Sequence, residues 1–342
     1  MSVQKNISTV SNTSSEISKT VEKAAEKATA QLTTAKDSIG QVILGQENVV
    51  DLAITAILSG GHTLLVGVPG LAKTLLVDTL GTVMGLESKR VQFTPDLMPA
   101  DIVGSEVLEE TTKGKRSFRF IPGPVFCQLL MADEINRASP RTQSALLQAM
   151  QERFVTVAGV RHDLPAPFHV LATQNPIEQE GTYPLPEAQL DRFLFQIDVE
   201  FPKLETEKEI LIATTGAGST TAKRAITPKQ LIEMQALVRK LPIGDSVVDA
   251  ILTLVRNARP SQTTLPDIKE SVSWGPGPRA GQALMLATRA KALIDGRLSP
   301  SIDDVLELAG PVLKHRMALS FAARADGQTL EKTIATLKAS IA

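Results

Sequence analysis

The chain has 342 residues, of which 43% are hydrophobic and 21% charged, and its formal net charge is −1. This composition is typical of a globular protein long enough to form two domains. The near-zero net charge argues against a general polyanion-binding protein, and the single cysteine, Cys127, excludes an intrachain disulfide and a cysteine-based metal cluster. Because no apolar run approaches the roughly 20 residues that span a bilayer and the start lacks a secretory apolar region, we expect a cytoplasmic protein without membrane insertion.

Residues 1–37 are predicted to form an N-terminal tail. Residues 1–15 are rich in Ser, Thr and Asn, which predicts disorder. From residue 16 to residue 36, apolar side chains recur at helical spacing with Glu and Lys on the other face, which predicts an amphipathic helix. This helix either docks on a partner or a neighbouring subunit, or stays a weakly ordered solvated segment, and the residues leave both interpretations open.

Residues 38–202 alternate apolar strand-like runs with helical patterns, which predicts an α/β domain with a mostly parallel sheet and ligands at the carboxyl ends of its strands. Residues 97–124 interrupt the alternation as an insertion rich in Gly, Pro and charge, and residues 154–164 predict a β-hairpin. Residues 203–225 are expected to form a linker. Residues 226–342 show helical patterns and are expected to form a second domain.

The strongest motif is a strand, a glycine-containing loop and a helix between residues 64 and 83. Backbone N–H groups in such a loop face one anion together, and the helix N-terminus adds partial positive charge, so the motif predicts a phosphate cradle. Lys73 is expected to reach the β- and γ-phosphates of a nucleotide, and Thr74 to offer its hydroxyl to Mg²⁺. The expected phosphate-binding residues are Gly67, Val68, Pro69, Gly70, Leu71, Ala72, Lys73, Thr74 and Leu75.

Two further features flank this motif in the sequence. Ala72 stands where a glycine usually precedes the lysine, and alanine is tolerable there if its φ is negative. The apolar segment that ends at Gly45 and Gln46 is expected either to wrap an adenine base or to belong to the core.

Polar side chains follow two other apolar strands. Asp133 and Glu134 end the first, and ATP hydrolysis needs a carboxylate that holds Mg²⁺ and a base that orients the attacking water. We expect Asp133 to hold the metal and Glu134 to activate the water. Asn175 follows the second strand, where its amide could hydrogen-bond the γ-phosphate, although an ordinary turn asparagine before Pro176 would have the same pattern.

Three arginines are candidates for stabilising the charge that develops on the phosphates: Arg137, Arg192 and Arg279. A guanidinium offers fixed planar donors to phosphate oxygens. Each of the three, taken alone, would also fit an ordinary surface position.

Together the stretches GVPGLAKT, LLMADEINRA, ATQNP, EAQLDRF and GPGPRA resemble the MoxR family of AAA+ ATPases in order and spacing, over about residues 38–342. The resemblance implies an AAA+ P-loop core with a parallel five-stranded sheet flanked by helices, helix-2 and pre-sensor-1 inserts, and a C-terminal all-α lid domain. It implies ATP and Mg²⁺ as cofactors and a homo-oligomeric ring of six. It also implies a protein client and a partner with a von Willebrand factor A domain.

The resemblance further implies a role for each candidate residue, and family members often carry alanine at the position of Ala72. These implied roles are Walker A for Lys73 and Thr74, Walker B for Asp133 and Glu134, sensor 1 for Asn175, an arginine finger for Arg192, sensor 2 for Arg279 and adenine contact for Gly45 and Gln46. An arginine finger acts on the ATP of the neighbouring subunit, so hydrolysis would depend on assembly.

We therefore expect an ATP-driven chaperone or remodelling machine. One alternative is a nucleic-acid motor, and a second is a nucleotide-gated scaffold with little turnover. The sequence disfavours nucleic acid, because its only local positive features are Lys113, Lys115, Arg116, Arg161 and His162. Neither insert carries an aromatic-hydrophobic-glycine loop, which favours surface remodelling of a client over threading.

Overall fold

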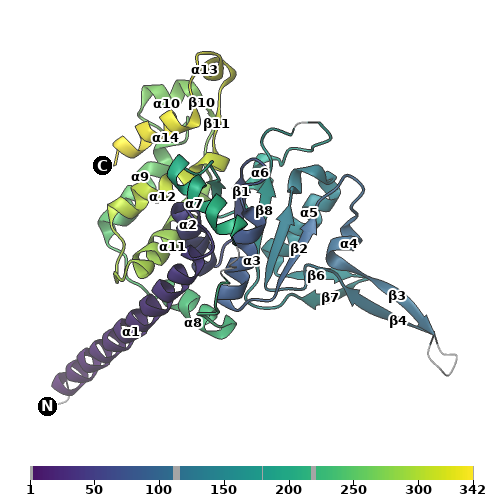
Figure 1. Cartoon of the computed structure of the whole chain (residues 1–342). Helices are drawn as coiled ribbons and strands as arrows, with labels where there is room; N and C mark the ends of the chain where they lie inside the picture. The colour runs from purple at the N-terminus through teal and green to yellow at the C-terminus, as the bar shows by residue number, and fades with distance from the viewer. Residues whose placement is uncertain (1–2, 111–115, 179, 217–220, 342) are drawn as a thin grey trace.

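A five-stranded parallel sheet forms the centre of the molecule, as expected (Figure 1). The structure is a computed structural model that describes residues 3–110, 116–178, 180–216 and 221–341. The strand order is β2-β5-β8-β1-β9. The strands are β1 (Thr63–Val66), β2 (Ser88–Gln92), β5 (Leu129–Asp133), β8 (His169–Gln174) and β9 (Phe195–Asp198).

Both faces of the sheet are covered, because the central strands carry apolar side chains on both sides. Leu65 of β1 packs in a cluster with the helices α2 (Glu47–Leu58) and α3 (Lys73–Met84). Leu64, one position earlier, points to the opposite face and packs in a second cluster with α4 (Pro99–Val103) and α5 (Pro140–Glu152). The core is therefore a three-layer α/β domain.

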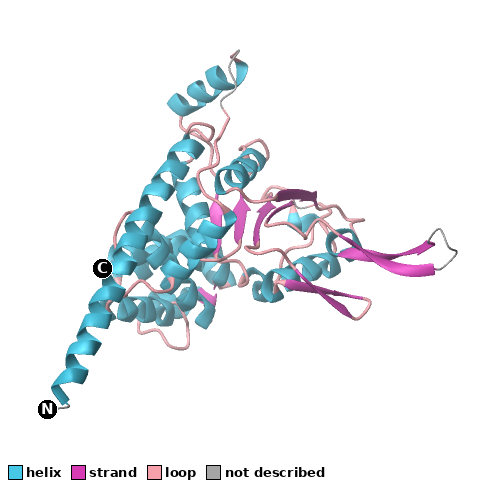
Figure 2. Ribbon diagram, turned by 90° about the horizontal axis from the view of Figure 1, so that it is seen from below, coloured by secondary structure: helices cyan, strands magenta, loops and turns pink. Residues whose placement is uncertain are grey.

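The two expected insertions are antiparallel hairpins that project on the side away from the helical domain (Figures 1 and 2). The first pairs β3 (Gly104–Glu110) with β4 (Arg116–Pro122), and the second pairs β6 (Phe154–Val157) with β7 (Val160–Asp163). Lys113 and Lys115, between β3 and β4 in the sequence, lie outside the described residues. Short helical turns, η1 (Ile135–Arg137) and α6 (Glu187–Leu190), follow strands β5 and β8.

The C-terminal lid domain is helical, as expected. Its helices are α8 (Pro228–Val238), α9 (Asp245–Asn257), α10 (Pro266–Ser271), α11 (Pro278–Ile294), α12 (Ile302–Leu313), α13 (Phe321–Ala325) and α14 (Leu330–Ala339), with the turn η2 (Lys314–Arg316). The lid also contains a short antiparallel pair, β10 (Val272–Trp274) with β11 (Ala318–Leu319). The sequence did not predict this pair, because two or three residues are too few to show a strand period.

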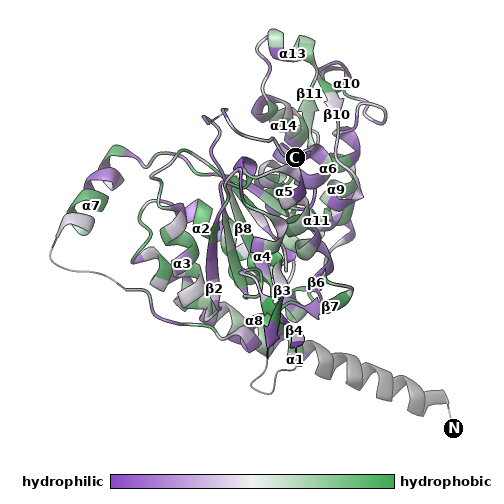
Figure 3. Ribbon diagram, turned by 90° about the vertical axis from the view of Figure 1, so that its right-hand side faces the viewer, coloured by the Kyte–Doolittle hydropathy of each residue, from purple (hydrophilic) through white to green (hydrophobic). Residues whose placement is uncertain are grey.

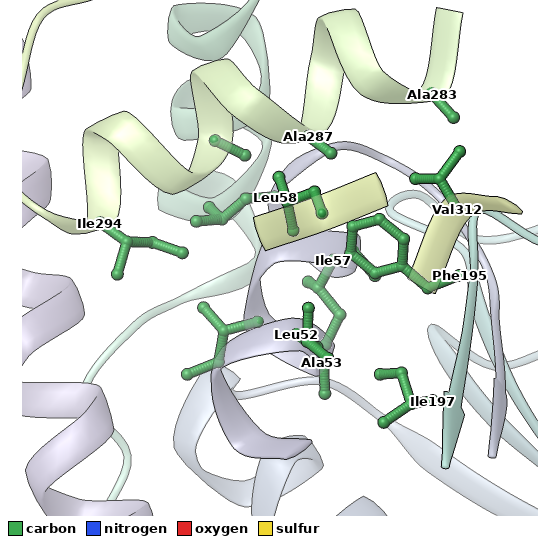
Figure 4. Close-up of a cluster of buried hydrophobic side chains, with 14 of the residues drawn as sticks. Leu52, Ala53, Ile57, Leu58, Phe195, Ile197, Ala283, Ala287, Ile294 and Val312 are labelled. Atoms are coloured by element: carbon green, nitrogen blue, oxygen red, sulfur yellow. The ribbon is translucent and has the colours of Figure 1, made fainter. Parts of the chain in front are cut away.

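The lid and the α/β core share one hydrophobic cluster (Figure 4). Helix α2 lies between β9 and the lid, with its Leu58 close to Ala287 of α11 and its Ile57 close to Phe195 of β9. Val312 of α12 closes the cluster from the lid side. The lid is therefore held along the β9 edge of the sheet.

The N-terminal helix α1 (Val3–Gly40) belongs to the same core. Its buried side chains include Ala25, Ala28, Leu32 and Ile39, and the Thr29 hydroxyl donates to the Leu293 carbonyl of α11 at 2.9 Å. The small alanines allow α1 to approach the helices of its own chain closely. Between residues 25 and 39 the apolar face of α1 packs within its own chain, so this part of the helix differs from both expectations, being neither solvated nor left free for a partner. The disorder of residues 1–15 stays a prediction.

Helix α7 (Leu204–Thr215) occupies part of the segment that the sequence predicted as a linker. None of its side chains is buried. Its sequence therefore lacks the regular apolar positions of a helix that packs on a core, which would have distinguished it from a linker. Figure 3 shows it at the edge of the molecule. Residues 217–220, also within the predicted linker, lie outside the described residues. No helix in the described parts of the chain combines the length and apolarity needed to cross a bilayer.

Candidate functional site

The loop between β1 and α3 is held tightly against the neighbouring strand. A Cβ atom on Gly67 would lie 2.7 Å from the Val199 carbonyl oxygen, so no side chain fits there. Lys73 begins α3, and its ammonium group donates to the carbonyls of Gly67 and Val68. The lysine is thereby folded back over the loop, in the place where it could meet a phosphate chain.

The charge of Lys73 is balanced by the acids at the end of β5. Partial burial lowers the pKa of Lys73, although the nearby carboxylates of Asp133 and Glu134 act in the opposite direction. The structure therefore brings together the lysine and the two acids that the sequence singled out separately. Thr74 and Leu75 complete the first turn of α3 and direct their N–H groups toward the loop.

Ala72 has a φ of +54°, in the left-handed region, so the condition under which the sequence made alanine tolerable there is not met. The residue is the N-cap of α3, where the chain must turn sharply from the loop into the helix. Left-handed backbone costs a non-glycine residue about 1–2 kcal/mol. The loop therefore adopts the conformation suited to glycine although an alanine occupies it.

Thr173 of β8 fixes both acids, and the sequence analysis did not single it out. Its hydroxyl donates to Asp133 Oδ1 at 2.6 Å and accepts from the backbone N–H of Glu134 at 2.8 Å. Thr173 is only 1% exposed. Its position at the end of a strand, within the stretch ATQNP, was the available signal.

Two side chains of β2 also bind the acids. Arg90 Nε donates to Asp133 Oδ2 at 3.1 Å, and Gln92 Nε2 donates to Glu134 Oε2 at 2.7 Å. Arg137 donates to the same Glu134 oxygen at 3.1 Å. Arg90 and Gln92 alternate along β2 and so point to the same side, next to β5.

Asn175 lies at the same edge of the sheet, one residue beyond β8. Its Oδ1 accepts from the Ile177 N–H at 3.2 Å, and its Nδ2 lies 3.4 Å from Glu178 Oε2. Asn175 thus makes the hydrogen bond of an ordinary turn asparagine, which was the alternative role that the sequence left open. The amide still stands beside the strand end that carries Asp133, because β5 and β8 are parallel neighbours.

Gly45 and Gln46 line a cavity of about 540 Å³. Asp198 and Glu200, which flank Val199, also line it, so the cavity adjoins the phosphate loop. Its volume is within the range of small-molecule sites. Gly45 has a φ of +69°, and a Cβ atom there would lie 2.2 Å from the methyl group of Thr206 in α7. The cavity wall is therefore built on a glycine that cannot be replaced without moving α7.

Arg192 and Arg279 lie together, but away from this edge. In the parallel pair of β1 and β9, Thr63 is opposite Phe195 and Val66 is opposite Asp198. Arg192 precedes β9 while the phosphate loop follows β1, so the length of a four-residue strand, roughly 13 Å, separates their ends. Arg279 Nη1 lies 3.6 Å from Asp191 Oδ2, directly beside Arg192. Both arginines therefore lie at the amino edge of the sheet, Arg279 through its ion pair with the residue that precedes Arg192.

Arg316 anchors Asp191 at this edge, and the sequence analysis missed it. The side chain is 2% exposed and donates to Asp191 Oδ1 at 2.7 Å and to the Phe193 carbonyl at 2.6 Å. Burial lowers the pKa of this guanidinium, while its bond to Asp191 opposes the shift. In sequence, Lys314, His315 and Arg316 resemble a surface charge run, so only the lid's packing could reveal the role.

Comparison with known proteins agrees with this architecture. The family of ATPases associated with various cellular activities (AAA) matches residues 62–195, and the AAA lid domain matches residues 266–337. Chaperone MoxR1 of Mycobacterium tuberculosis is 43% identical over 289 residues, which are 84% of this chain and 76% of that protein. Protein MoxR of Paracoccus denitrificans is 30% identical over 308 residues, which are 85% of this chain and 89% of that one.

The fold leads to the same family. A crystal structure from Cytophaga hutchinsonii, of a protein assigned as an ATPase, has a TM-score of 0.86 and 36% sequence identity, and the match covers 93% of this chain and 96% of that one. Sequence identity, domain order and sheet topology therefore agree that the chain belongs to the MoxR family of AAA+ ATPases.

Proposed function

We propose that this protein hydrolyses ATP to ADP and phosphate at sites shared between subunits of a ring, and uses the cycle to remodel a protein client. One observation carries the proposal: each chain presents a phosphate loop with two acids at one edge of its sheet and an arginine pair at the other edge. A single chain cannot bring the two edges together. A neighbouring copy can, and a closed ring satisfies every copy.

The sheet edge that carries the phosphate loop is proposed to bind the nucleotide. The N–H groups of Val68 and of residues 70–75 hold the phosphates, because the Gly67 N–H is bonded to the Gln174 carbonyl and Pro69 has none. Lys73 turns from its carbonyl partners to the β- and γ-phosphates. The cavity beside Gly45 and Gln46 receives the base.

The residues present fit a magnesium ion. Thr74 and Asp133 offer a hydroxyl and a carboxylate oxygen, which are hard ligands of the kind that Mg²⁺ prefers. Thr173 already orients the Asp133 carboxylate by its hydrogen bond. Bound there, the ion would neutralise negative charge on the β- and γ-phosphates.

Glu134 is the proposed base that orients and deprotonates the attacking water. Its bonds to Gln92 and Arg137 fix the direction of the carboxylate. Asn175 is proposed to hold the γ-phosphate from the adjacent strand. Arg192 and Arg279, supplied by the neighbouring subunit, then stabilise the charge that develops on the transferred group.

A protein client fits the surface better than a nucleic acid. On the β3–β4 hairpin, Phe118 is 70% exposed and Leu108 is 51% exposed, which suits contact with apolar protein surface. The arginines of both hairpins within the described residues are paired instead: Arg119 with Glu109, Arg116 with Glu110 and Arg161 with Asp163. A cytoplasmic ring of six and a partner with a von Willebrand factor A domain are proposed from family membership.

The test is the steady-state ATPase rate against protein concentration, with mass measured in parallel. We expect specific activity to rise as the ring assembles, to vanish when Mg²⁺ is chelated, and to fall at least about 100-fold in Arg192→Ala and in Glu134→Gln. Arg324→Ala, an exposed arginine on the lid helix α13, serves as control. A rate that is independent of concentration and of Arg192 would refute the shared site, and a fully active Glu134→Gln would refute the base.

A further inference from the structure

Arg137 lies between two carboxylates. Its Nη1 donates to Glu134 Oε2 at 3.1 Å and lies 3.6 Å from Glu178 Oε1. The hydrogen bond to Glu134 and the charge of Glu178 both raise the pKa of this guanidinium. A single cationic group therefore serves the proposed base and a second acid, which the sequence analysis did not single out.

Glu178 has a second partner in Asn175. Its Oε2 lies 3.4 Å from Asn175 Nδ2, while its Oε1 faces Arg137. One carboxylate thus contacts both the amide that is proposed to hold the γ-phosphate and the guanidinium that binds Glu134. The four side chains form a continuous series of polar contacts from the end of β8 to the end of β5.

The chain on both sides of Glu178 is fixed close to the turn η1, which carries Arg137. After Glu178, the Tyr183 N–H donates to the Asn136 carbonyl of η1 at 2.6 Å. The side-chain amide of the fully buried Gln143 donates to the Tyr183 carbonyl at 2.9 Å. Before Glu178, the chain leaves the end of β8. The position of Glu178 beside η1 is therefore set by the fold.

The Arg137 side chain depends on these acids for its orientation. It is 36% exposed, and among the described residues Glu134 and Glu178 are its polar partners. A long side chain gives up much rotamer freedom when it is held in one place, and a half-exposed ion pair gains little in return. Without Glu178, a single bond would have to hold the guanidinium against Glu134.

Asn175 can leave this series of contacts more easily than Arg137 can. Charge-assisted N–H···O bonds are strongest at about 2.7–2.9 Å, so the contact of 3.4 Å between Asn175 and Glu178 is weak. When the Asn175 amide turns to a γ-phosphate, Glu178 keeps Arg137 as its remaining partner. Glu178 would then hold Arg137, and through it Glu134, more firmly when a γ-phosphate is bound.

We propose that Glu178 is a positioning residue that couples Asn175 to Glu134 through Arg137. This inference rests on the proposed function, because it takes Asn175 as the γ-phosphate contact and Glu134 as the base. It makes hydrolysis depend on the γ-phosphate through side chains of a single subunit. Arg137 then orients the base and does not stabilise the phosphates directly.

The first test is the single-turnover rate of ATP hydrolysis, measured on the full chain at a high protein concentration. Glu178→Gln should lower this rate about three- to tenfold, because the neutral amide holds the guanidinium less firmly. Adding Glu178→Gln to an Arg137→Gln chain should change the rate less than about 1.5-fold, since no guanidinium is left to orient. Glu180→Gln removes the same charge from an exposed position two residues further on, and should behave as wild type.

The second test is calorimetric binding of a non-hydrolysable ATP analogue and of ADP. Glu178→Gln should bind the analogue about two- to fivefold more tightly, because the Asn175 amide loses a competing acceptor and a negative charge beside the γ-phosphate is removed. Binding of ADP, which has no γ-phosphate, should not change. A slower reaction with tighter binding distinguishes positioning from simple loss of structure, and Glu180→Gln should change neither affinity.

The outcomes separate this inference from the proposed function. Wild type that hydrolyses no ATP would refute the proposed function and the coupling with it. An active wild type would leave the proposed function standing, and the coupling alone would be overturned by any of three results. These are a Glu178→Gln chain that matches wild type, rate losses that multiply in the double variant, and a slower rate without tighter binding of the analogue.

Discussion

Arg90 Nε donates a hydrogen bond to Asp133 Oδ2 at 3.1 Å, across the neighbouring strands β2 and β5. The carboxylate that we propose as a magnesium ligand thus already has a cationic partner. Arg90 is half exposed, whereas the Asp133 side chain is 13% exposed, so the arginine is the partner free to move aside.

Arg90→Gln should therefore lower the Mg²⁺ concentration required for half-maximal ATPase activity about two- to fivefold, because it removes a cation that competes for one oxygen of Asp133. The measurement is a Mg²⁺ titration at fixed ATP. Arg119→Gln, which removes an ion-paired arginine of the β3–β4 hairpin, should leave the titration unchanged. An unchanged or higher requirement in Arg90→Gln would show that Arg90 does not compete with the ion.

Removing the two lid arginines that bind Asp191 should affect different properties: Arg316 the stability of the chain, and Arg279 its ATPase rate. Arg316 is buried, so Arg316→Ala should lower the free energy of unfolding by about 3 kcal/mol. Arg279 is 47% exposed at 3.6 Å, so Arg279→Ala should cost less than about 1 kcal/mol yet reduce the ATPase rate of the assembled protein at least about 100-fold. Urea unfolding and steady-state kinetics measure the two effects, and equal losses of stability would make Arg279 a structural residue.

Ala72→Gly should stabilise the protein. The substitution relieves about 1–2 kcal/mol of left-handed backbone strain and loses about 0.4–1 kcal/mol to the greater freedom of glycine in the unfolded chain, which leaves a gain of up to about 1.6 kcal/mol. The midpoint of urea unfolding measures it. Ala145→Gly, inside α5, is the matched control and should lose about 1 kcal/mol. Destabilisation by Ala72→Gly would show that the methyl group contributes packing that outweighs the strain.

Gly45→Ala should weaken ATP binding about fivefold or more, because the new methyl group meets Thr206 and the backbone of residue 45 is left-handed. The measurement is binding of a fluorescent ATP analogue. Gly40→Ala, where a Cβ atom meets nothing within 4 Å, should bind normally. Normal binding by Gly45→Ala would place the base somewhere other than this cavity.

Stability should fall between pH 7.5 and pH 5.5. Burial lowers the pKa of His62 to about 3 and that of His169 to about 4. The unfolded chain takes up protons below about pH 6.5 while the folded chain does not, so the full stability is present above that pH and is lost as the pH falls. Burial also lowers the pKa of His315 well below its usual value, so the three histidines together should cost about 4 kcal/mol over this interval.

Urea unfolding at both pH values measures this loss. His62→Gln should reduce overall stability, because the ring nitrogens bind the Met150 carbonyl and the Val170 N–H, yet remove about a third of the pH dependence. A pH dependence that is the same in wild type and His62→Gln would assign it to other groups.

The sequence predicted those parts of the site that are local in the chain. The phosphate loop, Asp133, Glu134 and Asn175 each follow an apolar strand directly, so strand periodicity was enough to place them at one edge of the sheet. The partners of these residues could not be predicted in this way. Arg90 meets Asp133 only through the register of β2 against β5, and Arg316 meets Asp191 only because the lid packs on β9. Helix α7 was read as linker because it buries no side chain.

The shared core in Figure 4 has a mechanical consequence. Leu58 and Val312 belong to different domains but to one close-packed cluster, and α1 bridges α3 and α11 across the same junction. Swinging the lid as a separate body would open that cluster and leave voids that close packing does not tolerate. Each chain should therefore move as one stiff block, and in the proposed ring we expect the ATP cycle to rotate neighbouring chains against each other rather than to bend a hinge within one chain.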